Sequence, residues 1–254
     1  YRIIKYLLSN TKRYSNILFF VLLHKPKTIL EIGVYTGRRA QEMIEAAKVF
    51  NKKIEYYGFD LFEMMNDKIL KKEMSKIPSS KKKIQQKLSK IADVKLFKGY
   101  TNKTLPKLKN TKVDFIFIDG GHDYLSVKHD FYATLNISNP NFKILFDDYV
   151  NNPAFGICKL VDGEIRRIFD TTLIKTYSEW HPSNKSNQIC YSSNMILIDS
   201  NTTKMPIETY YKPNDIQIFL RRYKFKRQVH QWIHTSQLLK LTIKPIWRYF
   251  KRLN

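Results

Sequence analysis

The chain has little cysteine and no long apolar run. Its 254 residues include only Cys158 and Cys190, which form no CxxC pair. A disulfide framework is therefore excluded, a zinc site is disfavoured, and we expect a reducing compartment, the cytoplasm. The longest apolar run near the start, residues 17–23, is far shorter than the roughly 18 residues that span a bilayer. No small-residue cleavage site follows, so we expect neither a transmembrane segment nor a signal peptide.

Acidic residues are scarce. There are 22 Asp and Glu against 45 Lys and Arg, which gives a net charge of +23. Such an excess favours anionic partners, although the abundance of Lys and Asn throughout the chain explains it equally well as composition. Hydrophobic residues make up 43% and aromatic residues 14%, which indicates a folded globular protein rather than a disordered one.

The last part of the chain lacks acidic residues altogether. From Gln217 onward, Arg and Lys alternate with Phe, Tyr, Trp and Leu. This pattern fits a basic amphipathic helix on the anionic inner face of a membrane. It also fits an arm that touches nucleic acid, or a helix docked on another subunit of a homo-oligomer.

Short apolar runs alternate with helical patterns from Thr28 onward. Strands are predicted at 28–33, 54–60, 94–99, 113–119 and 143–148, and helices at 38–50 and 125–136. Continuous apolar strands separated by helices predict an α/β fold with a doubly wound, mostly parallel sheet. We expect a helical N-terminal segment at 1–25, a main domain at 26–200 and a basic helical extension at 201–254.

A Lys-rich, helix-prone insertion at 63–92 breaks this rhythm, with SSKKK near its centre. Its position after the second strand would place it over the carboxyl edge of the sheet, as a lid or substrate wall. A solvated pair of charged helices explains the same composition.

The stretch EIGVYTG, residues 31–37, stands where the first strand meets the first helix. Gly33 and Gly37 let the backbone turn sharply and approach a ligand closely. The spacing does not match GxGxxG, so a dinucleotide site is disfavoured. Asp60 ends the second strand, where an acid of a doubly wound fold accepts hydrogen bonds from ribose hydroxyls. Together these features predict a nucleoside site.

Three carboxylates end neighbouring strands: Asp119 the fourth, Asp147 and Asp148 the fifth. They should converge at the carboxyl edge of the sheet. Because crowded carboxylates raise one another's pKa, a hard divalent cation with oxygen ligands would relieve the repulsion. Such an ion would also acidify and aim an alcohol oxygen. The alternative is that Asp147 or Asp148 caps the following turn.

His122 follows Asp119 in the motif FIFIDGGHDY. A histidine has an ordinary pKa near 6.5, which suits a general base at neutral pH, and a histidine in a loop also serves as a hydrogen-bonding scaffold. Asp119 is the second catalytic candidate. We expect Tyr124 and Tyr149 to shape the pocket wall. His181 lies on a polar loop; contact with the substrate is one interpretation, and a loop residue without a role in the site is the one we favour.

The motifs ILEIGVYTG, YYGFDLFE, LFKGYTNKTLP, FIFIDGGHDY and ILFDDY resemble those of class I S-adenosylmethionine-dependent methyltransferases. The chain looks most like the group of macrocin-type sugar O-methyltransferases and cephalosporin hydroxylase-like proteins. The resemblance covers residues 26–150 well, the segment to 200 more loosely, and the basic tail not at all. In that group, acids placed like Asp119, Asp147 and Asp148 hold magnesium.

The resemblance implies roles for individual residues. Glu31, Gly33 and Gly37 would line the methionine moiety of the cofactor, with Tyr35 in place of the central glycine of ExGxGxG. Asp60 would bind the ribose. The remaining cofactor contacts implied are Tyr100 and Thr101 beside the adenine, and Asp119.

The sequence therefore predicts an S-adenosylmethionine-dependent O-methyltransferase, assisted by a divalent metal, that acts on a sugar or another small hydroxylated molecule. Its charge suggests a nucleic-acid methyltransferase as an alternative. The Asn/Asp-Pro-Pro-aromatic signature of base-methylating enzymes is missing after the fourth strand, which ends in IDGGHDY. A non-catalytic, cofactor-binding scaffold at an anionic membrane surface is the third interpretation.

Overall fold

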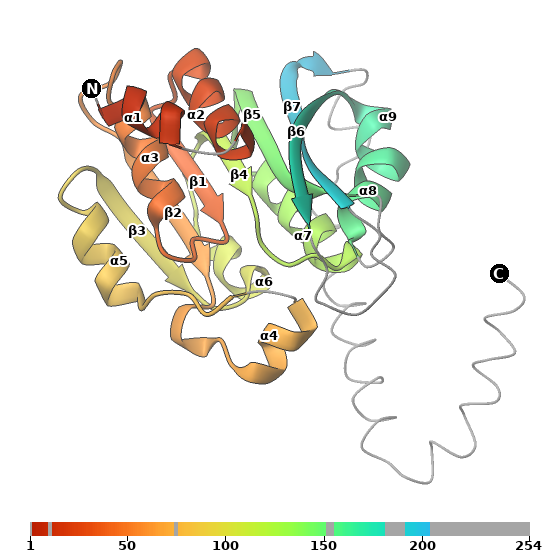
Figure 1. Ribbon diagram of the computed structural model, residues 1–254, viewed down its shortest axis with the longest axis horizontal. Helices are drawn as coiled ribbons and strands as arrows, with labels where there is room; N and C mark the ends of the chain where they lie inside the picture. The colour runs from red at the N-terminus through yellow and green to blue at the C-terminus, as the bar shows by residue number, and fades with distance from the viewer. Residues whose placement is uncertain (1, 10–11, 74–75, 151–154, 181–190, 204–254) are drawn as a thin grey trace, which may run out of the picture. The chain divides into compact units, whose positions relative to one another are not determined.

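The computed structural model describes residues 2–9, 12–73, 76–150, 155–180 and 191–203. The basic extension beyond residue 203 and His181 lie outside these ranges, so the roles predicted for them stay predictions. The described residues form one unit (Figure 1). No helix in these ranges is both long and apolar enough to cross a membrane.

The described residues contain a seven-stranded sheet with the order β3-β2-β1-β4-β5-β7-β6. The first five strands are parallel, β7 pairs antiparallel with β5, and β6 pairs antiparallel with β7. The strands are β1 Thr28–Ile32, β2 Glu55–Asp60, β3 Asp93–Lys98, β4 Val113–Ile118, β5 Ser138–Tyr149, β6 Phe169–Trp180 and β7 Tyr191–Thr203.

This topology confirms the predicted doubly wound, mostly parallel sheet. All five predicted strands form, and the fourth and fifth are neighbours as expected. β5 begins at Ser138, five residues earlier than predicted. The sequence did not predict β6 and β7, which extend the sheet beyond β5.

Helices flank the sheet, and the predicted N-terminal helical segment forms two of them, α1 and α2. The α-helices are α1 Arg2–Ser9, α2 Lys12–His24, α3 Arg38–Ala47, α4 Asp67–Glu73, α5 Lys81–Leu88, α6 Thr101–Thr104, α7 Tyr124–Leu135, α8 Gly156–Leu160 and α9 Arg166–Ile168. Two 3-10 turns lie after β2 and after α6, η1 Phe62–Met64 and η2 Leu105–Lys107, and a π-helical turn, η3 Val161–Ile165, joins α8 to α9.

The start of α7 shows how local sequence fixes a boundary next to the predicted site. Asp123 is the N-cap, and its side chain accepts hydrogen bonds from the backbone of Leu125 at 3.1 Å and Ser126 at 3.2 Å. Such a cap satisfies amides that have no partner within the helix. The helix therefore begins immediately after the loop that carries His122.

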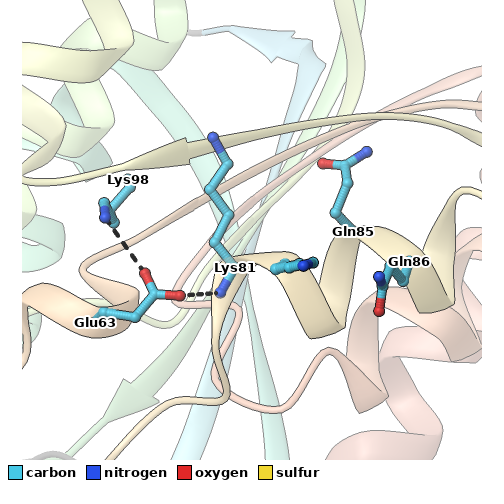
Figure 2. A pocket seen from close by; sticks show the side chains of 6 residues that line it. Glu63, Lys81, Gln85, Gln86 and Lys98 are labelled. Carbon is cyan, nitrogen blue, oxygen red and sulfur yellow. Dashed lines mark hydrogen bonds and ion pairs between the residues drawn. The ribbon is translucent and has the colours of Figure 1, made fainter.

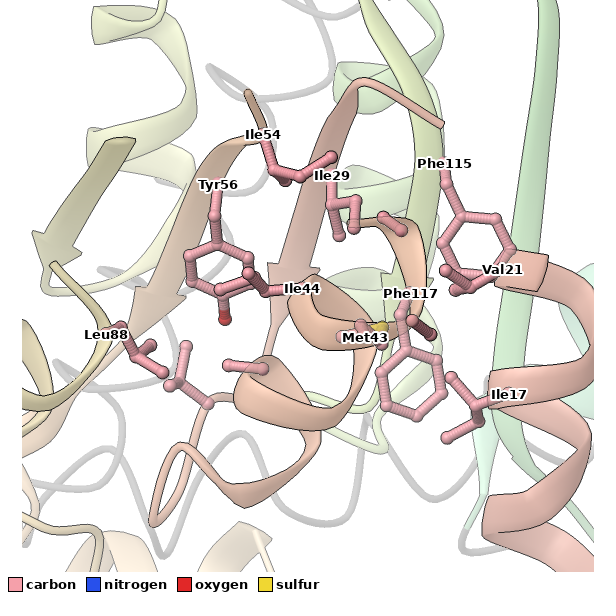
Figure 3. Close-up of a cluster of buried hydrophobic side chains, with 14 of the residues drawn as sticks. Ile17, Val21, Ile29, Met43, Ile44, Ile54, Tyr56, Leu88, Phe115 and Phe117 are labelled. Carbon is pink, nitrogen blue, oxygen red and sulfur yellow. The ribbon is translucent and has the colours of Figure 1, made fainter. Parts of the chain in front are cut away.

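The main hydrophobic cluster lies between one face of the sheet and helices α2, α3 and α5 (Figure 3). Phe115 and Phe117 of β4 point into it and meet Ile17 and Val21 of α2. On α3, residues spaced for one helical face are all buried: Ala40, Met43, Ile44 and Ala47.

The opposite face of the sheet packs on α7. The ring of Phe131 in this helix lies 6.0 Å from that of Phe146 in β5. Side chains of β4 point alternately to the two faces of the sheet, and those from Phe115 to Ile118 are all buried, as expected of a sheet covered on both faces. The central strands are therefore packed on both faces.

The insertion at 63–92 forms α4 and α5 and docks on the loop after β1. Ile84 and Leu88 of α5 are buried, and the backbone amide of Ser79 donates to the carbonyl of Tyr35 at 3.0 Å. Part of this segment is thus packed rather than solvated. Its role as a lid or substrate wall stays a prediction.

Candidate active site

Residues 33–37, the glycine turn, connect β1 to α3 in a strained backbone conformation. Gly33 has φ +94°, Tyr35 φ 50° and Gly37 φ 68°, all in the left-handed region that favours glycine. A Cβ on Gly33 would lie 1.8 Å from the carbonyl oxygen of Asp119. Only glycine therefore lets β1 and β4 end side by side, and Tyr35 has a backbone conformation that favours glycine.

Asp60, at the end of β2, holds the glycine turn in place. Its carboxylate accepts hydrogen bonds from the backbone amides of Tyr35 at 2.8 Å and Phe62 at 3.2 Å, one on each oxygen. A carboxylate oxygen can accept two hydrogen bonds. Asp60 is partly exposed, so it can still bind the hydroxyls of a ribose.

Glu31 lies beneath the glycine turn and is fully buried. One oxygen accepts a hydrogen bond from the hydroxyl of Tyr56, and Oε1 has no hydrogen-bond partner within the described residues. Burial raises the pKa of the Glu31 carboxyl to about 8, although Tyr56 acts to lower it. The residue is an interior acid with one unsatisfied acceptor that faces away from solvent.

The residues predicted beside an adenine, Tyr100 and Thr101, open α6 after β3 and are partly exposed. Sequence reasoning missed their neighbour His129 in α7, which is 5% exposed. Burial lowers the pKa of His129 to about 4, and neither ring nitrogen has a hydrogen-bond partner among the described residues. A neutral imidazole thus borders this part of the sheet edge.

The three strand-end acids converge as predicted. Ile118 of β4 pairs with Phe146 of β5, so the next residues, Asp119 and Asp147, stand at the same level of the sheet. Asp148 follows with φ 54°, a left-handed conformation that aspartate tolerates. This bend interrupts the regular pairing of β5 with β7. We call Asp119, Asp147 and Asp148 the carboxylate cluster.

The sequence did not predict the positive charge in this cluster, which comes from Arg13 at the start of α2. Its Nε donates to Asp147 Oδ1 at 2.7 Å, and Nη2 lies 2.6 Å from both Asp147 Oδ2 and Asp148 Oδ1. Arg13 is 8% exposed and Asp147 is fully buried. The hydroxyl of Ser193 in β7 also donates to Asp148 Oδ1 at 2.9 Å.

The acids of the cluster differ in protonation because their partners differ. Burial and the charges of Asp147 and Asp148 raise the pKa of Asp119 well above its ordinary range. Burial also raises the pKa of Asp147, to about 6, although Arg13 opposes this. For Asp148, hydrogen bonding to His122 and the charge of Arg13 overcome burial and lower the pKa to about 2.

His122 points at this cluster. Its Nε2 lies 3.0 Å from Asp148 Oδ2. The ring meets Phe155 edge-on with centroids 4.7 Å apart, and the amide of Gly156 donates to the His122 carbonyl at 2.6 Å. The imidazole is therefore fixed from two sides, by a carboxylate and by an aromatic ring.

Two predicted pocket-wall tyrosines contact acids of the π-helical turn η3. Tyr124 hydrogen-bonds to Glu164, and the hydroxyl of Tyr149 donates to Asp162 at 2.9 Å. Burial raises the pKa of both phenols. Neither tyrosine contacts the carboxylate cluster through these bonds, and their role as pocket walls stays a prediction.

An open groove of about 390 Å³ lies between the insertion and β3 (Figure 2). Glu63 crosses it, accepting from the amide of Lys81 at 2.7 Å and pairing with Lys98 at 3.5 Å. The groove contains none of the predicted catalytic residues. Its lining residues are Glu63, Lys81, Lys82, Gln85, Gln86 and Lys98.

The donor set predicted for a divalent cation does not fit one in this arrangement. Within the ranges that the structure describes, no three His, Cys, Asp or Glu side chains are placed to hold a metal ion. Three of the four oxygens of Asp147 and Asp148 contact Arg13, and the fourth contacts His122. The convergence of the acids was predicted correctly, but the structure places a guanidinium where the prediction placed a metal.

Comparison with known proteins shows which family the segment around this site is similar to. Residues 30–149 match the model of the family Methyltransf_24, described as a methyltransferase domain. This stretch begins within β1, ends with β5, and includes the glycine turn and the carboxylate cluster. This stretch is therefore similar to a methyltransferase domain, and the resemblance found in the motifs is confirmed. A search of curated protein sequences found no match.

Solved structures share the fold. The O-methyltransferase TomG from Streptomyces achromogenes, in complex with S-adenosylmethionine, aligns with a TM-score of 0.51 at 14% identity, covering 74% of this chain and 79% of TomG. An O-methyltransferase from Bacillus cereus, in complex with S-adenosylhomocysteine, aligns with a TM-score of 0.51 at 16% identity, covering 75% of this chain and 81% of the other. At these identities the likeness concerns the fold.

Proposed function

We propose that this protein transfers a methyl group from S-adenosylmethionine to a hydroxyl of a small molecule. The observation that carries the proposal is the pair formed by His122 Nε2 and Asp148 Oδ2, 3.0 Å apart, at the sheet edge that also holds the glycine turn. A base beside a cofactor site is what O-methylation of a weakly acidic alcohol requires.

The residues at the sheet edge fit the cofactor. Gly33, Tyr35 and Gly37 would hold its amino-acid end, because the backbone turns sharply here and the partly exposed Gly33 adds no side chain. Asp60 keeps acceptor capacity for the ribose hydroxyls. Tyr100 and Thr101 would flank the adenine. When bound, S-adenosylmethionine supplies an electrophilic methyl group on a sulfonium.

The proposed base is His122 in one tautomer. When Nε2 carries the proton and donates to Asp148, the lone pair of the neutral ring lies on Nδ1. Nδ1 then accepts the hydroxyl proton while the oxygen attacks the methyl carbon. Asp148 stabilises the imidazolium that forms, as a carboxylate does in a catalytic triad. Asp119, the second catalytic candidate, would line the same edge.

The acceptor class follows from this chemistry. A neutral base next to a sulfonium suits an alcohol or phenol, and a sugar hydroxyl is the form of acceptor that the resemblance favours. The proposed reaction uses no metal ion at the carboxylate cluster, because Arg13 already contacts the oxygens of Asp147 and Asp148 that a cation would need.

The partner we propose for the basic extension is an anionic membrane surface. Its support is the acid-free alternation of cationic and apolar residues from Gln217 onward. Contact of this kind would place the enzyme at the inner face of a membrane.

A labelled-methyl assay tests the proposed function. The full chain is incubated with S-adenosylmethionine labelled in the methyl group and panels of nucleotide sugars, phenols and RNA. Label in a hydroxylated small molecule, sensitive to His122→Ala, is the expected result. Label transferred only to RNA would favour the nucleic-acid alternative, and cofactor binding without transfer to any panel member would favour a scaffold.

A further inference from the structure

The acids expected to hold a metal ion already have a cation, and it belongs to the protein. Arg13 contributes its Nε and Nη2 to three contacts of 2.6 to 2.7 Å with Asp147 and Asp148. Bidentate contact of a guanidinium with carboxylates is among the strongest and most directional of charged hydrogen bonds.

Most carboxylate oxygens of Asp147 and Asp148 already accept hydrogen bonds, so few are available to another cation. Asp147 Oδ1 accepts from Arg13 and from the amide of Asp148 at 2.9 Å. Asp148 Oδ1 accepts from Arg13 and from Ser193, and Asp148 Oδ2 contacts His122. Asp147 Oδ2 has no hydrogen-bond partner among the described residues, but it lies 2.6 Å from Arg13 Nη2. A magnesium ion would need several of these oxygens at about 2.1 Å, which is incompatible with the guanidinium in its present place.

Arg13 is held firmly by its own helix. Ile17, Leu18 and Val21 on the same face of α2 are each at most 1% exposed and anchor the helix in the main hydrophobic cluster. The neighbouring side chain, Tyr14, lies under the guanidinium of Arg39 at 4.0 Å. A movement of Arg13 away from the acids would therefore disturb the packing between α2, α3 and the sheet.

The arginine also lies outside the segment that defines the methyltransferase domain. That segment spans residues 30–149, whereas Arg13 stands 134 residues before Asp147 in the chain. The N-terminal helices thus complete the site electrostatically.

We propose that Arg13 stands in place of a divalent cation: its single positive charge offsets part of the negative charge of Asp147 and Asp148 and, through Asp148, positions His122. This inference rests on the proposed function for the role of His122. It predicts that methyl transfer by this protein needs no divalent ion at the carboxylate cluster. Arg13 acts through other residues and is a positioning residue.

Metal binding tests this inference without any methyl acceptor. Mn²⁺ is titrated into the full chain and followed by electron paramagnetic resonance. The wild type is expected to bind no more Mn²⁺ than the double variant Asp147→Asn, Asp148→Asn. Arg13→Ala is expected to melt at a lower temperature, to gain a Mn²⁺ site that needs Asp147 and Asp148, and to recover stability when Mn²⁺ is added. A merely structural arginine would not yield a metal site on removal.

Arg2→Ala is the matched control. Arg2 belongs to α1, its side chain is 76% exposed, and it pairs with Glu45 at 3.6 Å. This variant should melt and bind Mn²⁺ as the wild type does. If Arg13→Ala does not fold, Arg13→Lys serves in its place. Lysine keeps the positive charge but cannot make the bidentate contact of a guanidinium. This variant should fold, melt at a lower temperature than the wild type and have no Mn²⁺ site.

A Mn²⁺ site in the wild type that disappears in the Asp147→Asn, Asp148→Asn variant would overturn the inference, as would an Arg13→Ala variant as stable as the wild type and without a metal site. Titration with S-adenosylhomocysteine separates this failure from failure of the proposed function. A wild type that binds both this ligand and Mn²⁺ refutes only the role of Arg13, whereas one that binds neither refutes only the function.

Discussion

The guanidinium of Arg13 and the carboxylate of Asp147 form a buried ion pair that joins the first helices of the chain to the fifth strand of the sheet, with Nε 2.7 Å from Oδ1. Removing one partner of such a pair leaves an uncompensated buried charge, at a typical cost of about 3–5 kcal/mol. The pair therefore makes the N-terminal helices part of the site rather than an appendage to it.

The close approach of β1 and β4 predicts that Gly33→Ala strongly lowers the stability of the fold. A Cβ there would lie 1.8 Å from a backbone oxygen, in a residue with φ +94°. We expect a loss of about 3 kcal/mol or more in the free energy of unfolding, measured with urea.

The matched control is Gly163→Ala. A Cβ on Gly163 meets nothing within 4 Å, and alanine is the better residue in a helical turn. This change should leave stability equal or raise it by about 0.5–1 kcal/mol. Equal stability of the two variants would refute the steric account of the glycine turn.

The buried carboxyl of Glu31 predicts that stability falls as the pH rises. Its pKa is 4.5 in an ordinary environment and about 8 in the folded protein. Between these values the folded state binds the proton and the unfolded state does not, so the contribution is complete below pH 4.5 and lost as the pH rises through 8.

Glu31→Gln should remove this part of the pH dependence. The comparison is the free energy of unfolding of wild type minus variant at several values between pH 5 and pH 8.5, where we expect a change on the order of a few kcal/mol. Parallel pH profiles for the two proteins would show that Glu31 is ionised in the folded state.

The His122–Asp148 pair predicts a specific kinetic defect. With an acceptor found in the labelled-methyl assay, His122→Ala should lower kcat by at least about 10²-fold, the typical contribution of a general base. Cofactor affinity, measured by calorimetry, should change by no more than a few-fold. The control, His24→Ala, removes a histidine that contacts the carbonyl of Asp114 at 3.2 Å, beside β4. If both variants keep full kcat, His122 is not the base.

The acid-free extension predicts binding to lipid. Truncation after Asp215 should reduce sedimentation with vesicles that contain anionic lipid, and added salt should weaken the binding of the full chain. Vesicles of neutral lipid are the control. Identical sedimentation of the two forms would rule out this role.

The sequence predicted the five parallel strands and the meeting of the acids at one edge because both follow from local patterns. Strands buried on two faces are apolar throughout, and parallel neighbours end at the same edge. The antiparallel strands β6 and β7 were not predicted, because runs such as FDTTLIKTYSEW mix polar and apolar residues without a clear period. Their strength as strands comes from pairing with β5 and with each other.

The partner of the acids could not be predicted, since it depends on tertiary packing. Arg13 is one of 45 Lys and Arg residues, and nothing in the sequence on either side of it distinguishes it from a solvent-exposed arginine. Only the docking of α2 through Ile17 and Val21 brings it to Asp147. Without α2, three converging acids indicate a divalent cation.

Calorimetric titration with S-adenosylmethionine, in buffer with chelator, tests the central claim most directly. Asp60 should hold the ribose at the end of β2, whereas the exposed Asp93 begins β3 at the opposite edge of the sheet. We predict that the wild type and Asp93→Ala bind one equivalent of cofactor with similar affinity, and that Asp60→Ala binds it at least about tenfold more weakly, as expected when charged hydrogen bonds are lost. No binding by the wild type, or equal binding by all three proteins, would contradict the account.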